Sequence, residues 1–350
     1  MLRLVFMGSD AIALPALNWL AGEGCSVARV VGVFTQPDRA FGRGQQVQPN
    51  AIKLWAQAHD VPVWQPTKVD ADARAQLAAV QPDVTLVLAY GHLLRQEFID
   101  TPRLGTLNLH TSLLPKLRGA SPIQTAIATG ECETGVTLMR MVLRLDAGPV
   151  GDVQRVPIDP LDTATEVEAK LAQACVPLLA RALPQLTTGA LVFTPQDEAQ
   201  VTYCRRHVKD DGVLDFAAPA AALAGRINGL APWPGCVIAL NGQPVKLGSA
   251  DVPAQCHLIG DIANASHSAT CHLIGDIATT PGTVLGADAE GLLVATGAGV
   301  LRLRKLQRPG GKLLPAVDFL RGFPGAPGTS LLSRPMTALV SSVPFPRVKN

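Results

Sequence analysis

The first 190 residues alternate short apolar runs with longer segments of helical periodicity, and this alternation limits the possible folds more than any other feature. The apolar runs cover residues 2–7, 28–35, 61–64, 84–90, 105–110 and 136–142. Segments with apolar residues three or four positions apart, as in helices, cover 13–21, 50–59, 70–80, 93–99, 122–129 and 163–188. This order predicts a doubly wound, mostly parallel (Rossmann-like) α/β domain.

The chain changes character after residue 207. Short apolar runs separated by Gly and Pro replace the alternation, and Asn241-Gly242 between two such runs is typical of a type I′ hairpin turn. With one helix expected at about 217–230, the pattern predicts a smaller OB-like β-barrel domain. The expected organisation is a first domain at 1–190, a linker at 191–206, a second domain at 207–330 and a tail at 331–350.

The turn after the first strand reads Gly8-Ser9-Asp10, and Ser9 or Asp10 can cap the helix that follows. It lacks the glycine pattern G-x-G-x-x-G that cradles a pyrophosphate, so a nicotinamide site is poorly supported. The polar loop at 36–49 is longer than most loops of a compact domain, and loops of this length are usually functional or mobile.

Polar side chains stand where three of the expected strands end. Asn108 and His110 share one strand face, and an amide beside an imidazole can hold a carbonyl oxygen while a proton moves. Tyr90-Gly91 and Asp146 follow two other strands, and ligands bind at the carboxyl ends of parallel strands. From the residues alone, His110 is also compatible with a hydrogen-bonded core histidine, and Asp146 with a turn residue.

The seven cysteines are scattered, with no C-x-x-C pair, which argues against a disulfide framework and against zinc. The motif Cys-His-Leu-Ile-Gly-Asp-Ile-Ala occurs at 256–263 and again at 271–278, and we interpret it as a local duplication in a loop rather than a metal site. The formal net charge is only +2, so a nucleic-acid partner would need a local basic patch.

Several groups of residues occur in a distinctive order along the chain. They are Phe6-Met7-Gly8, Thr35 to Arg39 with Gly42-Arg43-Gly44, Asn108-x-His110-x-Ser112 to Pro115 with Arg118-Gly119, Leu145 to Gly148, Tyr203, Asp215, Arg226-Ile227, Pro232 to Gly235, Leu306-Gln307, Gly311-Lys312 and Asp318 to Gly322. From about residue 2 to 322, with an interruption near 251–280, the combination resembles the methionyl-tRNA formyltransferase family. Ser-Leu-Leu-Pro is common to folate-dependent formyltransferases, whereas Gln-Pro-Asp-Arg and Pro-Trp-Pro-Gly narrow the resemblance to the tRNA enzyme.

The resemblance implies transfer of a formyl group from 10-formyltetrahydrofolate to the α-amino group of methionyl initiator tRNA, without a metal. It implies that Asn108 donates to the oxygen that becomes negative, that His110 moves the proton of the attacking amine, and that Asp146 pairs with His110. Ser112 could in principle carry the acyl group, but direct transfer requires no covalent intermediate. The folate is expected against Ala89, Tyr90, Gly91, Ser112, Leu113, Leu114 and Pro115.

For the tRNA, the resemblance points to Arg39 and Arg43 in the loop at 36–49, where they would meet phosphate or base edges. The second domain has as many acidic as basic residues, so a tRNA site there requires a one-sided patch. We expect Arg302, Arg304 and Lys305 in it, because 302 and 304 share a strand face.

Two other functions remain open at this stage. One is a folate-dependent formyltransferase that acts on a small amine, such as a nucleotide sugar or glycinamide ribonucleotide. The other is an RNA-binding module with an inactive first domain. We expect a cytoplasmic protein, because the number and wide spacing of the cysteines fit a reducing setting, and we expect a monomer. No stretch approaches the length of a membrane span.

Overall fold

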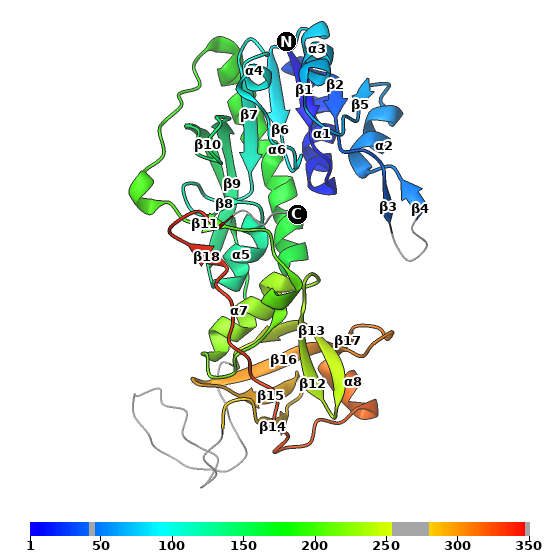
Figure 1. The fold of residues 1–350 in the computed structure, drawn as a ribbon, viewed down its shortest axis with the longest axis vertical. Coiled ribbons are helices and arrows are strands. Elements are labelled where there is room, and N and C mark those ends of the chain that lie inside the picture. Colours follow the sequence, from blue (N-terminus) through cyan, green and yellow to red (C-terminus); the bar gives the residue numbers. More distant parts are fainter. Residues whose placement is uncertain (42–45, 254–279, 347–350) are drawn as a thin grey trace. The chain divides into compact units, whose positions relative to one another are not determined.

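The computed structural model describes residues 1–41, 46–253 and 280–346. Arg43 and both copies of the duplicated motif lie outside these described residues. Within the chain, contacts define two compact units (Figure 1). Unit 1 comprises Met1–Gly119, Glu133–Pro157 and Glu168–Tyr203, and unit 2 comprises Ala120–Cys132, Ile158–Val167 and Cys204–Asn350.

Unit 1 is built on a seven-stranded sheet with the order β10-β9-β7-β6-β1-β2-β5. Its strands are β1 (Leu2–Met7), β2 (Ala28–Phe34), β5 (Val63–Trp64), β6 (Val84–Val87), β7 (Thr106–His110), β9 (Glu133–Arg140) and β10 (Val150–Pro157). The five strands from β7 to β5 are parallel, and β9 and β10 extend the β7 edge in antiparallel fashion. The predicted parallel-rich, Rossmann-like sheet is therefore confirmed.

Three of the helical segments of unit 1 start where the sequence supplies a cap. Asp10, Asn50 and Asp70 each accept a hydrogen bond from a backbone amide in the first turn that follows. The elements are η1 (Ala11–Ala13), α1 (Leu14–Ala21), η2 (Glu23–Ser26), α2 (Ala51–Ala58), α3 (Ala71–Ala79), α4 (Gln96–Ile99) and α6 (Ala164–Thr188), of which α6 begins in residues assigned to unit 2.

Side chains from both faces of the sheet are buried. Val5 and Met7 share a core cluster with Leu77 of α3 and Phe98 of α4, so these two helices cover one face. Phe6 points to the opposite face and is also fully buried, which shows that this face is covered as well. The packing on both sides leaves the carboxyl edge of the strands as the place for polar groups.

Three segments of unit 1 differ from the sequence-based expectation. The expected loop at 36–49 contains a small antiparallel hairpin, β3 (Arg39–Phe41) with β4 (Gln46–Gln48). The strand expected at 84–90 ends at Val87, because Ala89 has a φ of 52° and leaves the pleat. The edge strand β10 was not predicted, since its side chains are mostly half-buried and it contains no apolar run.

The first residues of the segment expected to be a linker, 191–206, are bonded to unit 1. An antiparallel bridge joins Thr194 to Val150, and Arg140 lies over the ring of Phe193 at 4.2 Å. Further along come η3 (Glu198–Gln200) and β11 (Tyr203–Cys204), which pairs with β8 (Arg118–Gly119). Residues 191–203 thus follow the surface of unit 1.

Unit 2 contains a curled antiparallel sheet with the order β12-β13-β16-β15-β14, to which β17 adds at β16. Its elements are α5 (Pro122–Ala128), η4 (Lys209–Gly212), α7 (Ala220–Leu230), β12 (Cys236–Leu240), β13 (Gln243–Asp251), β14 (Val284–Ala287), β15 (Leu292–Ala295), β16 (Val300–Gln307), β17 (Leu314–Pro315), α8 (Ala316–Gly322) and β18 (Val340–Ser341). The register shifts twice between β13 and β16, and such bulges bend a sheet. The expected second β domain is therefore present as a half-barrel.

Helix α7 packs both on this sheet and on α5. Gly225 and Gly229 allow the second contact, because an added Cβ would lie 2.9 Å from the Ile127 carbonyl oxygen and 2.5 Å from the Ala128 nitrogen, respectively. The two backbones can meet this closely only where no side chain separates them.

A buried carboxylate ties the start of unit 2 to its end. Asp211 is fully buried and accepts hydrogen bonds from Arg205 at 2.6 and 2.7 Å, from the Val208 amide at 2.8 Å and from Thr337 at 2.7 Å. Burial alone would raise the pKa of Asp211, but these hydrogen bonds outweigh it and hold the pKa well below the usual range. His207, beside it, has a lowered pKa because it too is buried.

Among the described residues, no helix combines the length and the apolar character that crossing a bilayer requires.

Candidate active site

Asn108 and His110 lie at the carboxyl end of β7, the strand at which the parallel part of the sheet meets the antiparallel strands β9 and β10. Val87 of β6 pairs with Asn108, so the chain that follows β6 passes beside both side chains. Asn108 is half-buried and His110 is buried. The topology therefore places the amide and the imidazole together at the edge where α/β sheets bind ligands.

The ring of His110 is held by the backbone. Its Nε2 donates to the carbonyl oxygen of Leu117 at 2.9 Å. Because a carbonyl can only accept, the proton of the neutral ring must be on Nε2, which leaves the lone pair on Nδ1. Leu117 has a φ of 59°, a conformation that few leucines adopt.

Asp146 lies on the other side of the ring. Its Oδ2 is 3.8 Å from Nδ1 of His110 and accepts a hydrogen bond from the Gly119 amide at 2.8 Å. Asp146 has a φ of 46°, and the turn closes so tightly that a Cβ on Gly148 would collide with the Arg140 carbonyl. The turn thus holds a carboxylate beside the nitrogen that can take a proton.

The loop from Ser112 to Pro115 has mainly structural contacts. Ser112 is buried, and its hydroxyl donates to the Lys116 carbonyl at 2.7 Å. The Thr137 hydroxyl donates to the Ser112 carbonyl and accepts from the Leu114 amide. The Ser112 hydroxyl is therefore committed to shaping the loop, which fits direct transfer better than an acyl-serine intermediate.

Residues 89–91, which follow β6, differ from one another in burial. The ring of Tyr90 belongs to the core cluster of unit 1, and burial raises the pKa of its hydroxyl. Ala89 and Gly91 are exposed, with φ angles of 52° and 79°. Of these three expected folate-binding residues, the two small ones are thus exposed just after β6, whereas the Tyr90 side chain faces away into the core.

The hairpin that carries Arg39 is connected to this edge. Arg39 donates to the side chain of Gln36 at 2.7 Å, and Gln36 donates to the Tyr90 carbonyl at 3.0 Å. Burial lowers the pKa of His92, and the nearby charge of Arg39 lowers it further. Arg39 therefore stands close to the segment that follows β6.

Sequence reasoning missed an apolar surface on the loop before Asp146. Val142, Leu143 and Leu145 are 38%, 67% and 51% exposed, respectively, although each is aliphatic. Three exposed aliphatic side chains within four positions are unusual unless something packs on them. The clue in the sequence was that the strand expected at 136–142 ran on into apolar residues beyond Arg140.

Arg118, which sequence reasoning quoted only as part of a motif, is a buried structural element. Its guanidinium is fully buried and donates to Gln196 at 2.8 and 3.1 Å and to Glu198 at 3.0 Å. It thus fixes residues 196–198 beside the loop that carries Leu117.

In unit 2, the expected basic residues lie on β16, but two of them are neutralised. Arg302 bonds Asp251 at 2.6 Å and Asp288 at 3.1 Å and also contacts Glu290. Its hydrogen bonds to Asp251 and Asp288 raise its pKa. Arg304 bonds Asp251 and Glu290 at 3.0 and 3.2 Å. Their positive charge is therefore largely balanced within the unit.

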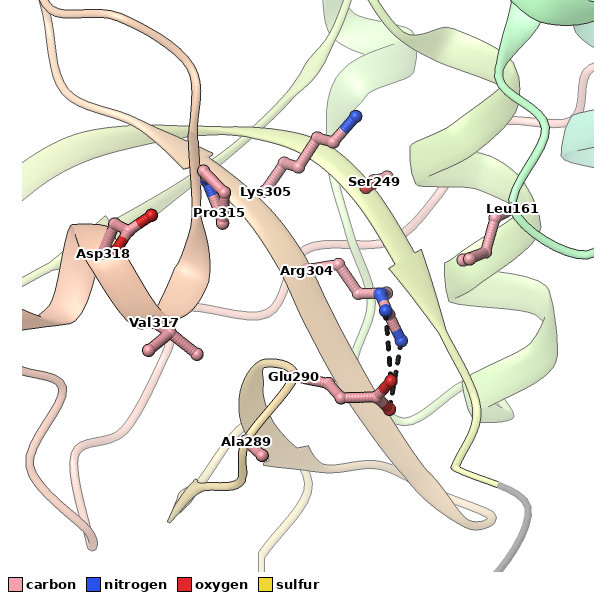
Figure 2. Close-up of a pocket in the computed structure, with 9 residues that line it drawn as sticks. All are labelled: Leu161, Ser249, Ala289, Glu290, Arg304, Lys305, Pro315, Val317 and Asp318. Carbon is pink, nitrogen blue, oxygen red and sulfur yellow. Dashed lines mark hydrogen bonds and ion pairs between the residues drawn. The ribbon is translucent and has the colours of Figure 1, made fainter.

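Lys305, the residue after Arg304 on β16, is exposed beside this cluster, at a point where the pairing of β13 and β16 shifts in register. Figure 2 shows its ammonium pointing away from the pair formed by Arg304 and Glu290. A pocket of about 600 Å³ lies here, lined by Leu161, Ser249, Ala289, Glu290, Arg304, Lys305, Pro315, Val317 and Asp318. Its charges are mixed, so it offers no uniformly basic surface.

The described residues contain no group of three or more His, Cys, Asp or Glu side chains placed to hold a metal ion.

Comparison with known proteins places both units. Residues 2–183 match the family model "Formyl transferase", and residues 206–324 match "Formyl transferase, C-terminal domain". A methionyl-tRNA formyltransferase of Ectopseudomonas mendocina is 41% identical over 318 residues, which cover 91% of this chain and 93% of the relative. One of Trichlorobacter lovleyi is 38% identical over 337 residues, with 96% and 99% covered.

Solved structures show the same fold at low identity. An N-formyltransferase from Helicobacter canadensis, solved with folinic acid and dTDP-3-aminofucose, has a TM-score of 0.61 and 15% identity, covering 87% of this chain and 99% of its own. A methionyl-tRNA formyltransferase from Clostridium thermocellum has a TM-score of 0.51 and 14% identity, covering 72% and 94%.

Proposed function

The chain belongs to the methionyl-tRNA formyltransferase family, and we propose that it transfers the formyl group of 10-formyltetrahydrofolate to the α-amino group of methionyl initiator tRNA. The observation that carries the chemistry is the placement of Nδ1 of His110 3.8 Å from Oδ2 of Asp146, on the strand face that also presents Asn108. A base, a carboxylate and an amide donor are what acyl transfer to an amine requires.

In this proposal, Nδ1 of His110 accepts the proton that the amine loses as its nitrogen bonds to the formyl carbon. Nε2 remains bonded to the Leu117 carbonyl, so the ring does not turn during the step. The imidazolium that forms lies beside Asp146, whose negative charge favours it. The same proton can then pass to the folate nitrogen as its bond to the formyl carbon breaks.

Asn108 would donate its amide N–H to the formyl oxygen as that oxygen becomes negative. Removal of one such donor typically slows acyl transfer by about 100- to 1,000-fold. Asn108 is half-buried, so a hydrogen bond from it would be only partly weakened by water.

The folate would lie along the edge formed by residues 89–91 and the loop before Asp146. Ala89 and Gly91 are exposed there, and Gly91, which has no side chain, lets a ligand approach the backbone closely. Leu143 and Leu145 can pack on an aromatic ring system. The loop from the buried Ser112 to Pro115 would form the floor of the site. Within this loop, the Leu113 side chain packs on Gly135.

The tRNA would contact both units. We assign Arg39, with Arg43 as a second candidate outside the described residues, to the acceptor end, because Arg39 stands near the segment after β6. In unit 2, Lys305 is the better candidate for phosphate contact, since Arg302 and Arg304 are already paired with carboxylates.

We further propose that the protein acts as a monomer in the cytoplasm, where initiator tRNA is used. Support for a reducing compartment comes from four of the described cysteines, Cys25, Cys132, Cys175 and Cys236, which are free thiols.

The test is a transfer assay with 10-formyltetrahydrofolate labelled in the formyl group. Methionyl initiator tRNA, methionyl elongator tRNA, an amino-sugar nucleotide and glycinamide ribonucleotide are offered in parallel. We expect label on methionyl initiator tRNA, with far less on the other three acceptors. Label on a small amine alone would support a different formyltransferase, and no label at all would contradict catalysis.

A further inference from the structure

Gln196 lies in the segment expected to be a linker, yet its amide joins two loops of the candidate active site. Its Nε2 donates to the carbonyls of Asp146 and Gly148, each at 2.8 Å. Its Oε1 accepts two hydrogen bonds from the buried Arg118, one from Nε and one from Nη2. The side chain therefore uses both amide hydrogens and both oxygen lone pairs within unit 1.

The chemistry of the partners fixes the orientation of this amide. A guanidinium can only donate and a backbone carbonyl can only accept, so Oε1 must face Arg118 and Nε2 must face the turn. No other arrangement of Gln196 would satisfy all four contacts. A carboxylate at this position would still bond Arg118 but would repel the two carbonyls.

The turn that Gln196 holds is a strained one. Asp146 has a φ of 46°, a left-handed conformation that a residue with a Cβ rarely adopts unless its surroundings hold it there. Gln196 binds the Asp146 carbonyl, and Gly119 binds the Asp146 carboxylate. These two contacts set the direction of the carboxylate that faces Nδ1 of His110.

The same segment also holds the other side of the ring. The Thr202 hydroxyl accepts from the Leu117 amide at 2.9 Å, and the Thr202 carbonyl accepts from the Arg118 amide at 2.9 Å. Leu117 carries the carbonyl that bonds Nε2 of His110. Residues 196–202 thus contact both loops that hold the imidazole and its carboxylate.

We propose that Gln196 is a positioning residue for formyl transfer, acting through its hydrogen bonds to the Asp146 turn. This inference rests on the proposed function, in which Asp146 stabilises the charged form of His110. Gln196 itself touches neither reactant. Loss of its two donated hydrogen bonds lets the turn relax and moves the carboxylate, and a shift of about 1 Å in such a group can cost up to about 100-fold in rate.

The first test is Gln196→Glu, which keeps the shape of the side chain and its bond to Arg118. We expect kcat to fall about 10- to 100-fold, with the KM values for tRNA and folate within about twofold of wild type. Gln200→Glu is the matched control, because Gln200 lies in the same segment and bonds only Asp197 at 2.8 Å among the described residues. A kcat for Gln196→Glu within twofold of the control would overturn the proposal.

A double-mutant cycle with Asp146→Asn separates positioning from general stability. If Gln196 acts through Asp146, Gln196→Glu should cost less than about threefold in the Asp146→Asn background. An equal cost in both backgrounds would show a role independent of Asp146 and would overturn the proposal. Should Gln196→Glu fold poorly by circular dichroism, Gln196→Met, which also lacks the donors, takes its place with the same expected results.

Failure of this inference is distinguishable from failure of the proposed function. An inactive wild-type protein would contradict formyl transfer itself. An active wild type with a fully active Gln196→Glu variant would contradict only the role of Gln196.

Discussion

The carbonyl oxygen of Leu117 lies 2.9 Å from Nε2 of His110, whereas Oδ2 of Asp146 lies 3.8 Å from Nδ1 of the same ring. A backbone carbonyl, rather than a carboxylate, therefore fixes the tautomer of this histidine. The carboxylate of Asp146 is left facing the nitrogen with the free lone pair. The Leu117 carbonyl thus orients the ring, and Asp146 places a charge beside the nitrogen that can take a proton.

Replacement of His110 by Gln should abolish proton transfer while keeping the bond to Leu117. A glutamine amide can still donate to the carbonyl but cannot take a proton near neutral pH. We expect kcat to fall about 100- to 10,000-fold, with the KM for tRNA within about twofold. Single-turnover formylation measures this, with His59→Gln on the exposed end of α2 as control; retained activity would remove His110 as the base.

Asp146→Asn should lower kcat by about 100-fold, because the charge beside the imidazolium is lost. Asparagine tolerates positive φ and can still accept from the Gly119 amide, so the turn should persist. Asp60→Asn is the control, since Asp60 also has a positive φ, of 53°. Equal kcat values for the two variants, measured at saturating substrates, would contradict a role for the Asp146 charge.

Arg39→Gln should weaken tRNA binding without affecting folate. We expect the KM for tRNA to rise about three- to tenfold, and the dependence of log K on log salt to become shallower by about one. The KM for folate should stay within about twofold. The exposed Arg29, changed to Gln, serves as control; if both variants bind tRNA like wild type, the hairpin does not contact it.

The ion pairs on β16 predict opposite outcomes for two basic residues. Arg302→Met leaves Asp251, Asp288 and Glu290 without their shared partner, so the free energy of unfolding should fall by about 2 kcal/mol. Lys305→Met should leave urea unfolding unchanged and raise the KM for tRNA. The reverse pattern would show that Arg302 binds the phosphates and Lys305 supports the fold.

The buried Asp211 predicts how stability responds to acid. Its pKa is lower in the folded state than in the unfolded state, so its contribution is complete above the unfolded value of ~3.9 and is lost as the pH falls below it. At pH 7, Asp211→Asn should destabilise the protein by about 3 kcal/mol. Urea unfolding between pH 7 and pH 3.5 should show this difference shrinking; a constant difference would contradict the assignment.

Most strands and helices were predictable because their cores leave a periodic pattern in the sequence. Val5 and Met7 lie two positions apart, as on one face of a strand, and Leu77 and Phe98 belong to segments with helical spacing of apolar residues. Asp10 and Asn50 mark the starts of the helices that they cap. Strand β10 left no such pattern because it lies at the sheet edge. The hairpin β3–β4 was missed for a similar reason, since β4 is exposed throughout.

The candidate site was predictable only where a side chain carries the chemistry. Asn108, His110 and Asp146 are residue types with recognisable functions, and strand topology brings them to one edge. The carbonyls of Leu117, Asp146 and Gly148 take part through backbone atoms that every residue possesses. Backbone contacts of this kind do not depend on residue type, so the sequence gives no sign of them. For that reason Gln196, which donates to the carbonyls of Asp146 and Gly148, could not be predicted as part of the site.

The path of residues 191–203 along unit 1 has a practical consequence for work with parts of this chain. A catalytic fragment cut at residue 190, where the strand-helix alternation stops, would lack Thr194, Gln196 and Thr202. Its helices and sheet would be complete, yet both loops around His110 would have lost their supports. A fragment intended for ligand screening or crystallisation should therefore extend at least to Tyr203.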